Sequence, residues 1–432
     1  MKYDKINSNL FKENRARFVA QMKPNSIAII HSNDMMSRNG DTHFAYRQSS
    51  DLFYLTGLDQ EEVILVLYPD CPRGNQFKEI VFTKATNEHI AVWEGYKYTK
   101  EDASQTAGIS TVFWLDEQQP LLNELILLAE RIYVNTNEND RAVLDYPSRD
   151  VRHALALKKE YVGHHFERAQ PIFKNLRMIK SSYEIDLMQK ACDITNSAFR
   201  RVLATTQPGM TEYEVEANII YEFTRQGSSG HAYTPIIAGG SNACVLHYIA
   251  NDQVLKAGDL ILMDFGAEYA NYAADLSRTI PVNGRFTPRQ KAVYNAVLRV
   301  KRAAENLLVV GNNLADYHKE VGRIMESELI NLGLLNKDAV RHQNPSRPLY
   351  KKYFMHGTSH HLGLDVHDLC HRYVDFAPGM VFTCEPGIYI PEENIGIRIE
   401  DDLVVTNGKP LNLMADIPIE VEEIELLMQA KV

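Results

Sequence analysis

The sequence predicts an α+β protein of two domains, in which an α/β domain precedes a domain of helices packed on an antiparallel sheet. The chain has 432 residues, enough for two or three domains and a large core. Strand-like and helix-like runs alternate up to about residue 165, and four well-marked helices with two strand pairs follow. We therefore expect one domain over residues 1–170 and a second over residues 171–432, joined near Pro171 to Lys180.

The first domain is expected to contain central strands, because several short runs are almost wholly apolar. The predicted strands are Ser26 to His31, Val63 to Tyr68, Ile80 to Thr83 and Ile132 to Val134, with helices over Leu121 to Ala129 and Ser148 to Leu157. This domain contains no compact group of residues that points to chemistry.

The helices of the second domain have clear start signals. Ser181, Thr211 and Thr287 are each followed three residues later by Glu or Gln, the pattern of a capping box. Thr287 is also followed by a proline at the first helical position. The first helix is predicted to end at Pro208-Gly209 and the second at about Gln226, and the apolar stripe of the third reaches Leu307. A fourth helix is predicted from about Ala315 to Leu332, with its stop at Gly333.

Composition excludes several classes of protein. The net charge of -10, without a basic stripe, argues against a nucleic-acid binder. The first twenty residues lack the apolar core of a signal peptide, and no apolar run approaches the roughly 20 residues that span a bilayer. The five cysteines are irregularly spaced and form no Cys-x-x-Cys pair, which is typical of reduced thiols and argues against structural zinc. We expect a cytoplasmic protein with no membrane partner.

Acidic residues mark the strands of the second domain. Asp264, Asp275, Glu385 and Glu400 lie on or beside strand-like runs, and His360 lies in a separate histidine-rich segment. Buried carboxylates are costly without a partner. A pair of divalent cations is the economical explanation, because such ions neutralise the charge and activate water near neutral pH. This pattern indicates a hydrolase.

The spacing of the acidic residues suggests two hairpins. A turn near Tyr269-Ala270 would place Asp264 and Asp275 directly opposite each other, with Cβ atoms about 4.5–5.5 Å apart. Glu385 and Glu400 bracket a second hairpin in the same way. A single Asp or Glu in such a run is more often a turn former or a solvated surface residue. Two hairpins that each carry a matched acidic pair favour the metal site.

The histidines leave alternatives open. His356, His360, His361, His367 and His371 lie close together, and histidines of this kind are often hydrogen-bonded and inert. His360 and His361 would point to opposite faces of an extended strand, so only one of them can be a ligand. The residues alone do not say which. His247 is a further candidate, because it lies in an apolar run before the first acidic hairpin.

Several of these motifs resemble those of the metallopeptidase family with the pita-bread fold, which includes aminopeptidase P, prolidase and methionine aminopeptidase. Leu176 to Ile185 resembles the entry to the catalytic domain, and Arg47 to Gly57 resembles the N-terminal domain of aminopeptidase P proteins. Three further segments resemble that group's histidine and glutamate motifs: His356 to His367, Gly379 to Ile390 and Gly396 to Asp402. The resemblance covers nearly the whole chain and implies a pita-bread catalytic domain.

The resemblance also implies roles for individual residues. It assigns two divalent metal ions, with Mn²⁺ favoured by the oxygen-rich set, to Asp264, Asp275, His360, Glu385 and Glu400, and it thereby chooses His360 over His361. Asp275 and Glu400 would bridge the ions. Glu385 would also shuttle protons, while His367 and His247 would steady the tetrahedral intermediate. His356, Tyr233 and Arg398 match pocket or neighbouring positions and are expected to bind substrate.

The implied activity is release of the N-terminal residue from peptides with proline in the second position. Aminopeptidase P is favoured over prolidase for two reasons. The stretch from Glu385 to Glu400 is short, whereas prolidases tend to have a longer insertion there, and Trp93-Glu-Gly95 resembles a segment of aminopeptidase P with a tryptophan near a subunit contact. A homodimer or homotetramer is expected on the same analogy. The alternatives are a prolidase, which cleaves Xaa-Pro dipeptides, and a non-catalytic pita-bread binding protein, which would not need the complete ligand set.

Overall fold

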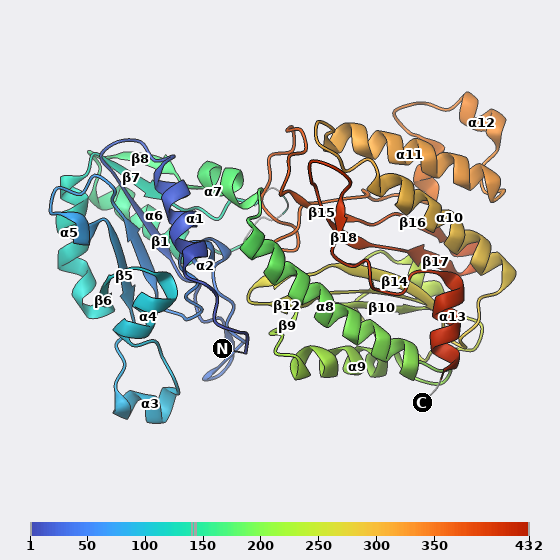
Figure 1. Ribbon diagram of the computed structural model, residues 1–432, viewed down its shortest axis with the longest axis horizontal. Helices are drawn as coiled ribbons and strands as arrows, with labels where there is room; N and C mark the ends of the chain where they lie inside the picture. Colours follow the sequence, from blue (N-terminus) through green and yellow to red (C-terminus); the bar gives the residue numbers. More distant parts are fainter. Residues whose placement is uncertain (1, 140, 142–144, 431–432) are drawn as a thin grey trace. The chain divides into compact units, whose positions relative to one another are not determined.

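The chain folds into two units (Figure 1). The computed structural model describes residues 2–139, 141 and 145–430. One unit comprises residues 3–177 and the other residues 178–432. The division follows α7 (Gln170–Arg177), a helix within the segment expected to connect the domains.

The first unit is built on a mixed six-stranded sheet in the order β6-β5-β4-β1-β7-β8. Its strands are β1 (Ser26–His31), β4 (Ile64–Leu67), β5 (Glu79–Thr83), β6 (Thr111–Trp114), β7 (Arg131–Val134) and β8 (His165–Arg168). The four predicted strands are confirmed. The two edge strands, β6 and β8, were not expected, and both are more solvent-exposed than the central strands.

Helices and a small hairpin complete this unit. The helices are α1 (Asn9–Val19), α2 (Ser50–Thr56), α3 (Glu88–Glu94), α4 (Lys100–Ala107), α5 (Gln118–Leu128) and α6 (Arg149–Glu160), and the hairpin pairs β2 (Ser37–Asn39) with β3 (Thr42–His43). The predicted helices correspond to α5 and α6. The core forms where Ile27, Val66 and Ile132 of the central strands pack with Leu125 of α5 and Leu157 of α6.

The capping boxes correctly predict three helices of the second unit, α8 (Ser182–Thr205), α9 (Glu212–Arg225) and α10 (Pro288–Glu305). The fourth predicted helix corresponds to α11 (Leu314–Asn331), whereas α12 (Lys337–Arg341) and α13 (Val421–Gln429) were not expected. All three capping boxes are present. The expectation that α10 continues to Leu307 is wrong. The helix ends at Glu305 because Asn306 caps it, with its side-chain amide donating to the Arg302 carbonyl at 2.7 Å.

Antiparallel strands form the interior of this unit. One sheet joins β10 (Ile236–Gly239), β11 (Leu260–Phe265) and β14 (Leu276–Pro281), and another joins β15 (Val381–Cys384), β18 (Asp401–Val404) and β19 (Leu411–Asn412). Smaller sheets join β9 (Gly230–His231), β12 (Ala267–Tyr269) and β13 (Tyr272–Ala273), and β16 (Gly387–Ile390) with β17 (Ile395–Arg398). Figure 1 shows α8 and α9 along one side of these strands and α10 and α11 along the other.

The first acidic hairpin turns one residue later than predicted. Its turn residues are Ala270 and Asn271, both with positive φ, and Tyr269 pairs with Tyr272. This shift moves the partner of Asp264 by two residues, from Asp275 to Ser277. The expectation that Asp264 and Asp275 are directly opposite is therefore wrong. They are diagonal neighbours on the same face, because side chains alternate along a strand.

The second acidic hairpin has the predicted register. Cys384 pairs with Asp401 on one side of the acidic pair, and Gly387 pairs with Arg398 on the other. Glu385 and Glu400 are therefore directly opposite each other, as expected.

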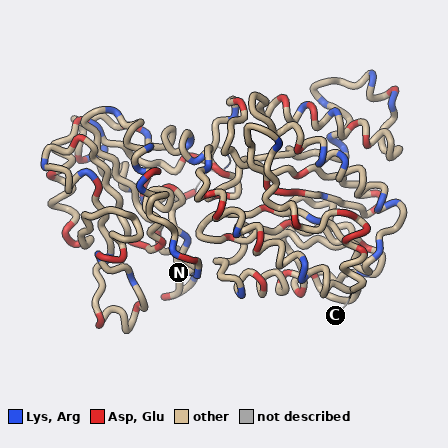
Figure 2. The backbone as a smooth tube through the Cα atoms, viewed as in Figure 1, with Lys and Arg blue, Asp and Glu red and all other residues tan. Residues whose placement is uncertain are grey.

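Charge is distributed over both units. Figure 2 shows acidic and basic residues interspersed along the described chain rather than gathered in one basic stripe. Among the described residues, every helix is too short or too polar to cross a membrane.

Candidate metal centre

The five predicted ligands come from different parts of the second unit. Asp264 lies in β11, and Asp275 immediately precedes β14. Glu385 lies between β15 and β16, and Glu400 lies between β17 and β18. His360 lies in the loop before β15. Asp275, His360 and Glu400 are buried.

The side chains of the predicted ligands lie close together. Asp275, His360 and Glu400 each offer a ligand atom, and these atoms all lie within 4.8 Å of one another. His360 Nε2 is 3.4 Å from Asp275 Oδ2 and 3.8 Å from Glu385 Oε1. A carboxylate pair and an imidazole at this separation are suited to a divalent ion.

Of the two adjacent histidines, it is His360 that faces the carboxylates. Its Nδ1 contacts the His361 carbonyl at 3.1 Å, which leaves Nε2 directed at Asp275 and Glu385. The His361 ring packs instead on Phe382, with ring centroids 4.1 Å apart. The local geometry thus distinguishes two histidines that the strand pattern left equivalent.

Asp264 is held by a tyrosine and an arginine. The Tyr233 hydroxyl lies 2.5 Å from Asp264 Oδ1 and 2.5 Å from Asp275 Oδ1, so its single proton is shared between the two carboxylates. Arg398 Nη2 donates to Asp264 Oδ2 at 2.6 Å, and its Nε donates to Ser277 Oγ at 2.8 Å. Tyr233 and Arg398 were expected to bind substrate, but their contacts here are with the acidic cluster.

The cluster has more negative charge than its own residues neutralise. Burial raises the pKa of Glu385 to about 7, although His360 and Arg398 oppose the rise. Burial and the neighbouring Asp275 raise the pKa of Glu400 well above its usual value, and burial raises that of Asp264 against the effect of Arg398. Divalent cations would supply the missing positive charge, so the residues present fit a metal pair.

The remaining histidines border this cluster to different degrees. His356 Nε2 contacts the Tyr389 hydroxyl at 2.8 Å, and its Nδ1 lies 3.6 Å from Glu385 Oε2. Burial lowers the pKa of His356 to about 3, and Arg398 and His247 add to the decrease. The ring of His367 lies 4.4 Å from that of His360. His247 is exposed, in the loop between β10 and β11.

Comparison with known proteins places this centre in a family. Residues 186–407 match Metallopeptidase family M24, and residues 11–133 match the aminopeptidase P N-terminal domain. The chain is 36% identical to the Xaa-Pro aminopeptidase of Escherichia coli, with 98% of each chain covered. The chain belongs to the aminopeptidase P family. The expected family, fold class and enzyme class, a metallopeptidase that uses divalent metal ions, are confirmed.

Other members of the aminopeptidase P family match this chain over most of its length. Human Xaa-Pro aminopeptidase 3 is 33% identical, with 92% of this chain and 80% of the relative covered. A putative aminopeptidase P from Bacillus anthracis has a TM-score of 0.90 at 31% identity, with 98% of this chain and 99% of that chain covered. Escherichia coli aminopeptidase P with the inhibitor Pro-Leu has a TM-score of 0.87 at 33% identity, with 99% of both chains covered.

Sequence reasoning missed residues that support the aminopeptidase P centre. Ser277 Oγ donates to Glu400 Oε2 at 2.7 Å, and Asp402 Oδ2 accepts the backbone N–H of Asp275 at 3.0 Å. The fully buried Tyr389 hydroxyl accepts from Arg398 Nη1 at 2.9 Å and contacts His356. Ser277 could have been found only with the correct hairpin register, since it lies opposite Asp264. Tyr389 has no signal in the sequence.

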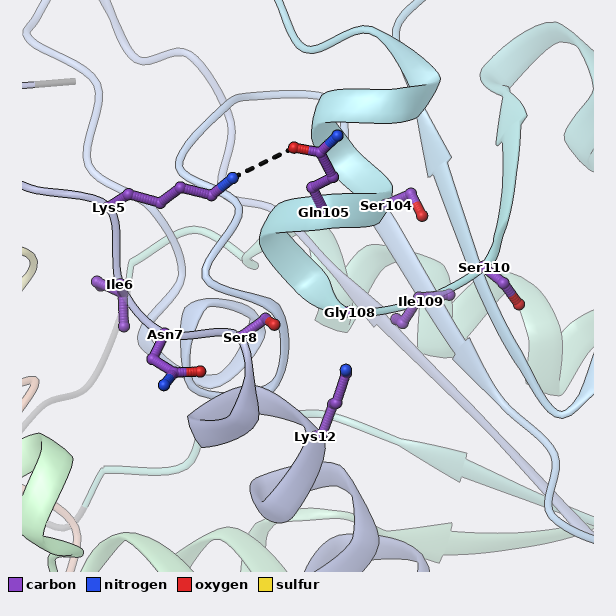
Figure 3. A pocket seen from close by; sticks show the side chains of 10 residues that line it. All are labelled: Lys5, Ile6, Asn7, Ser8, Lys12, Ser104, Gln105, Gly108, Ile109 and Ser110. Carbon is purple, nitrogen blue, oxygen red and sulfur yellow. Dashed lines mark hydrogen bonds between the residues drawn. The ribbon is translucent and has the colours of Figure 1, made fainter.

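A separate pocket lies in the first unit (Figure 3). It has a volume of about 620 Å³ and is lined mainly by the segment before α1 and by the end of α4. Lys5 donates to Gln105 across it at 3.3 Å. Lysine, serine and amide side chains supply most of its polar lining.

Proposed function

We propose that this chain releases the N-terminal residue from peptides whose second residue is proline, with two Mn²⁺ ions at the centre described above. The observation that carries the proposal is the convergence of Asp275, His360 and Glu400 beside Asp264 and Glu385. Membership of the aminopeptidase P family supports it, and two relatives that are 36% identical to this chain are named Xaa-Pro aminopeptidases.

The proposed ligands are the five residues of the cluster. Asp264, Asp275, His360, Glu385 and Glu400 would hold the two ions. When bound, the ions supply Lewis-acid chemistry, polarising the scissile carbonyl and lowering the pKa of the attacking water. Manganese is preferred because four of the five ligands are hard carboxylate oxygens.

The chain's own residues move protons and hold the substrate. Glu385 is the proposed base, since its carboxylate lies in the cluster, with Oε1 3.8 Å from His360 Nε2, within reach of a water held at the centre. His367 and His247 are proposed to donate hydrogen bonds to the oxygen of the tetrahedral intermediate, which is where such donors contribute most. His356 is proposed to line the proline side of the pocket with Tyr389, which fixes its ring at 2.8 Å.

Tyr233 and Arg398 have a more specific proposed role than substrate binding. Both contact Asp264, and Arg398 also contacts Ser277, the residue that donates to Glu400. They therefore order the carboxylates at two sides of the centre. A direct contact of either residue with substrate stays a prediction.

The choice between aminopeptidase P and prolidase is a choice of substrate length. An Xaa-Pro-Yaa tripeptide offers contacts beyond proline that can lower the barrier at the reacting bond. A prolidase requires the carboxylate that directly follows proline in a dipeptide. The test is kcat/KM for Xaa-Pro-Yaa, Xaa-Ala-Yaa and Xaa-Pro substrates. We expect the first to be preferred strongly, and a preference for the dipeptide would establish the prolidase alternative.

A homodimer or homotetramer and a cytoplasmic location are also proposed. The exposure of Val92 at 80% and Trp93 at 81% in α3 supports a subunit contact, because neighbouring large apolar side chains are rarely left in solvent. Light scattering of the purified chain and of a Trp93→Ala variant tests it. A wild-type protein that is monomeric at micromolar concentration would contradict the proposed oligomer.

A further inference from the structure

The loop that carries His247 is attached to the second unit at both ends and through two side chains beside the histidine, Leu246 and Tyr248. After β10, residues 240–244 form a short 3-10 helix, in which Ala243 packs with Tyr389 in a buried cluster. Before β11, the backbone of Gln253 accepts the N–H of Glu212 at 2.9 Å. Between these points alternate side chains face solvent, with Val245 54% and Ile249 60% exposed and His247 exposed, while Leu246 and Tyr248 pack on the same buried cluster.

One buried carboxylate reaches both ends of this loop. Glu212 is the first residue of α9, and its exposed fraction is 0%. Its Oε1 accepts from the Gly239 N–H at 2.8 Å and from Asn242 Nδ2 at 3.1 Å. Its Oε2 accepts from the Tyr248 hydroxyl at 2.7 Å and from the Gln253 N–H at 2.9 Å. Tyr248 is the immediate neighbour of His247, so the carboxylate holds the loop next to the histidine as well as at both ends.

The identity of this side chain follows from its partners. Every one of these contacts presents a donor, and a carboxylate is the side chain that accepts at both oxygens. Burial, together with the hydrogen bond to Glu212, raises the pKa of Tyr248 to about 12, so its hydroxyl keeps the proton that it donates. A glutamine would turn its NH₂ group toward one pair of donors and leave a buried N–H unpaired, which weakens the attachment of the loop.

We propose that Glu212 is a positioning residue for peptide hydrolysis, and that it acts by holding His247 in place through Tyr248 and the two ends of the loop. The inference rests on the proposed role of His247 at the tetrahedral intermediate. An exposed loop samples many positions, and a displacement of about 1 Å at a reacting group can cost about 10²-fold in rate. The buried carboxylate limits that displacement without contacting the substrate.

The test is a double-mutant cycle between Glu212→Gln and His247→Ala in the full-length, Mn²⁺-loaded protein with an Xaa-Pro-Yaa tripeptide. We expect His247→Ala to lower kcat about 10²-fold, as removal of a donor to an oxyanion does. Glu212→Gln should lower kcat about tenfold with KM changed less than about threefold. In the His247→Ala background the same substitution should change kcat less than about twofold, because the two residues act as one unit.

Two controls distinguish a positioning effect from a general loss of structure or of bound metal. Glu222→Gln changes another buried glutamate of α9, whose contacts are with Arg225, Gln226 and Arg201 rather than with the loop, and it should keep wild-type kcat. Metal content per chain should be equal in all variants. If Glu212→Gln does not fold, Tyr248→Phe replaces it in the cycle, with a several-fold loss of kcat expected that disappears in the His247→Ala background.

The outcomes separate this inference from the function on which it rests. An equal loss of kcat from Glu212→Gln in both backgrounds would overturn the link to His247 while leaving the role of His247 intact. Wild-type kcat in His247→Ala would remove His247 from the mechanism and the inference with it. Absence of turnover in the metal-loaded wild-type protein would contradict the proposed function itself.

Discussion

Glu385 and Glu400 face each other where the strand pairing of their hairpin is interrupted, at Glu385-Pro386 on one side and Ile399-Glu400 on the other. The strands are paired on both sides, at Cys384 with Asp401 and at Gly387 with Arg398. The backbone N–H of Glu385 donates instead to the Thr358 carbonyl at 2.8 Å, and that of Glu400 donates to the Ser277 carbonyl at 3.0 Å. Each glutamate is thereby tied to another segment that carries the centre, one next to His360 and the other in β14.

Glu385→Gln should give a folded protein with little turnover. The amide keeps the size of the side chain but loses its charge and its ability to take a proton. Loss of a general base costs about 10²–10⁴ in rate, and loss of a ligand adds to it. Steady-state kcat and metal content per chain are the measurements. Glu392→Gln, on the exposed turn of the same hairpin, is the control, and a Glu385 variant within a few-fold of wild type would exclude this residue from the mechanism.

The two adjacent histidines should respond differently to the same substitution. His360→Phe removes the imidazole that faces Asp275 and Glu385, so metal binding and activity should both fall by at least about 10²-fold. His361→Phe replaces a ring that packs on Phe382 and whose buried Nδ1 has no hydrogen-bond partner among the described residues. Removing such a polar atom is close to neutral or stabilising, so activity should stay within about threefold. Equal losses in the two variants would refute this assignment.

Stability of the first unit should fall in acid because of His153. Burial lowers the pKa of His153 from 6.5 to about 3, and the neighbouring His31 and Arg149 add to the decrease. A folded-state pKa below the unfolded value means that the unfolded chain binds the proton first. The contribution of neutral His153 to the free energy of unfolding is therefore full above pH 6.5 and is lost as the pH falls toward 3. His153→Phe should reduce the drop in urea midpoint between pH 7 and pH 5, whereas replacing the exposed His89 should leave it unchanged. An unaltered drop in the His153 variant would contradict this account.

Local signals predicted the central strands of the first unit and the main helices of the second. The capping boxes at Ser181, Thr211 and Thr287 identified three helix starts, because each pattern satisfies backbone donors within one turn of chain. Two strands of the six-stranded sheet that the sequence missed, β6 and β8, lie at its edges, where exposure removes the apolar run that marks a central strand. The end of α10 was missed because an asparagine side chain, not a glycine or proline, terminates it.

The metal centre was predictable as a set of residues but not in its geometry. The first hairpin shows why, since a turn at Ala270-Asn271 instead of Tyr269-Ala270 changes the partner of Asp264. Both registers keep Asp264 and Asp275 on one face, so the ligand prediction is insensitive to the error. The supporting contacts of Tyr389 and Glu212 depend on segments distant in sequence, and no local pattern encodes them.

The most direct test of the metallopeptidase account is a metal titration of the stripped protein. The chain is freed of metal with a chelator and dialysed, and Mn²⁺ is then added back while hydrolysis of an Xaa-Pro-Yaa tripeptide and bound metal per chain are measured together. The stripped protein should show no turnover, and turnover should become full as occupancy approaches two ions per chain. Full activity with well under one ion per chain would contradict a metal-dependent mechanism.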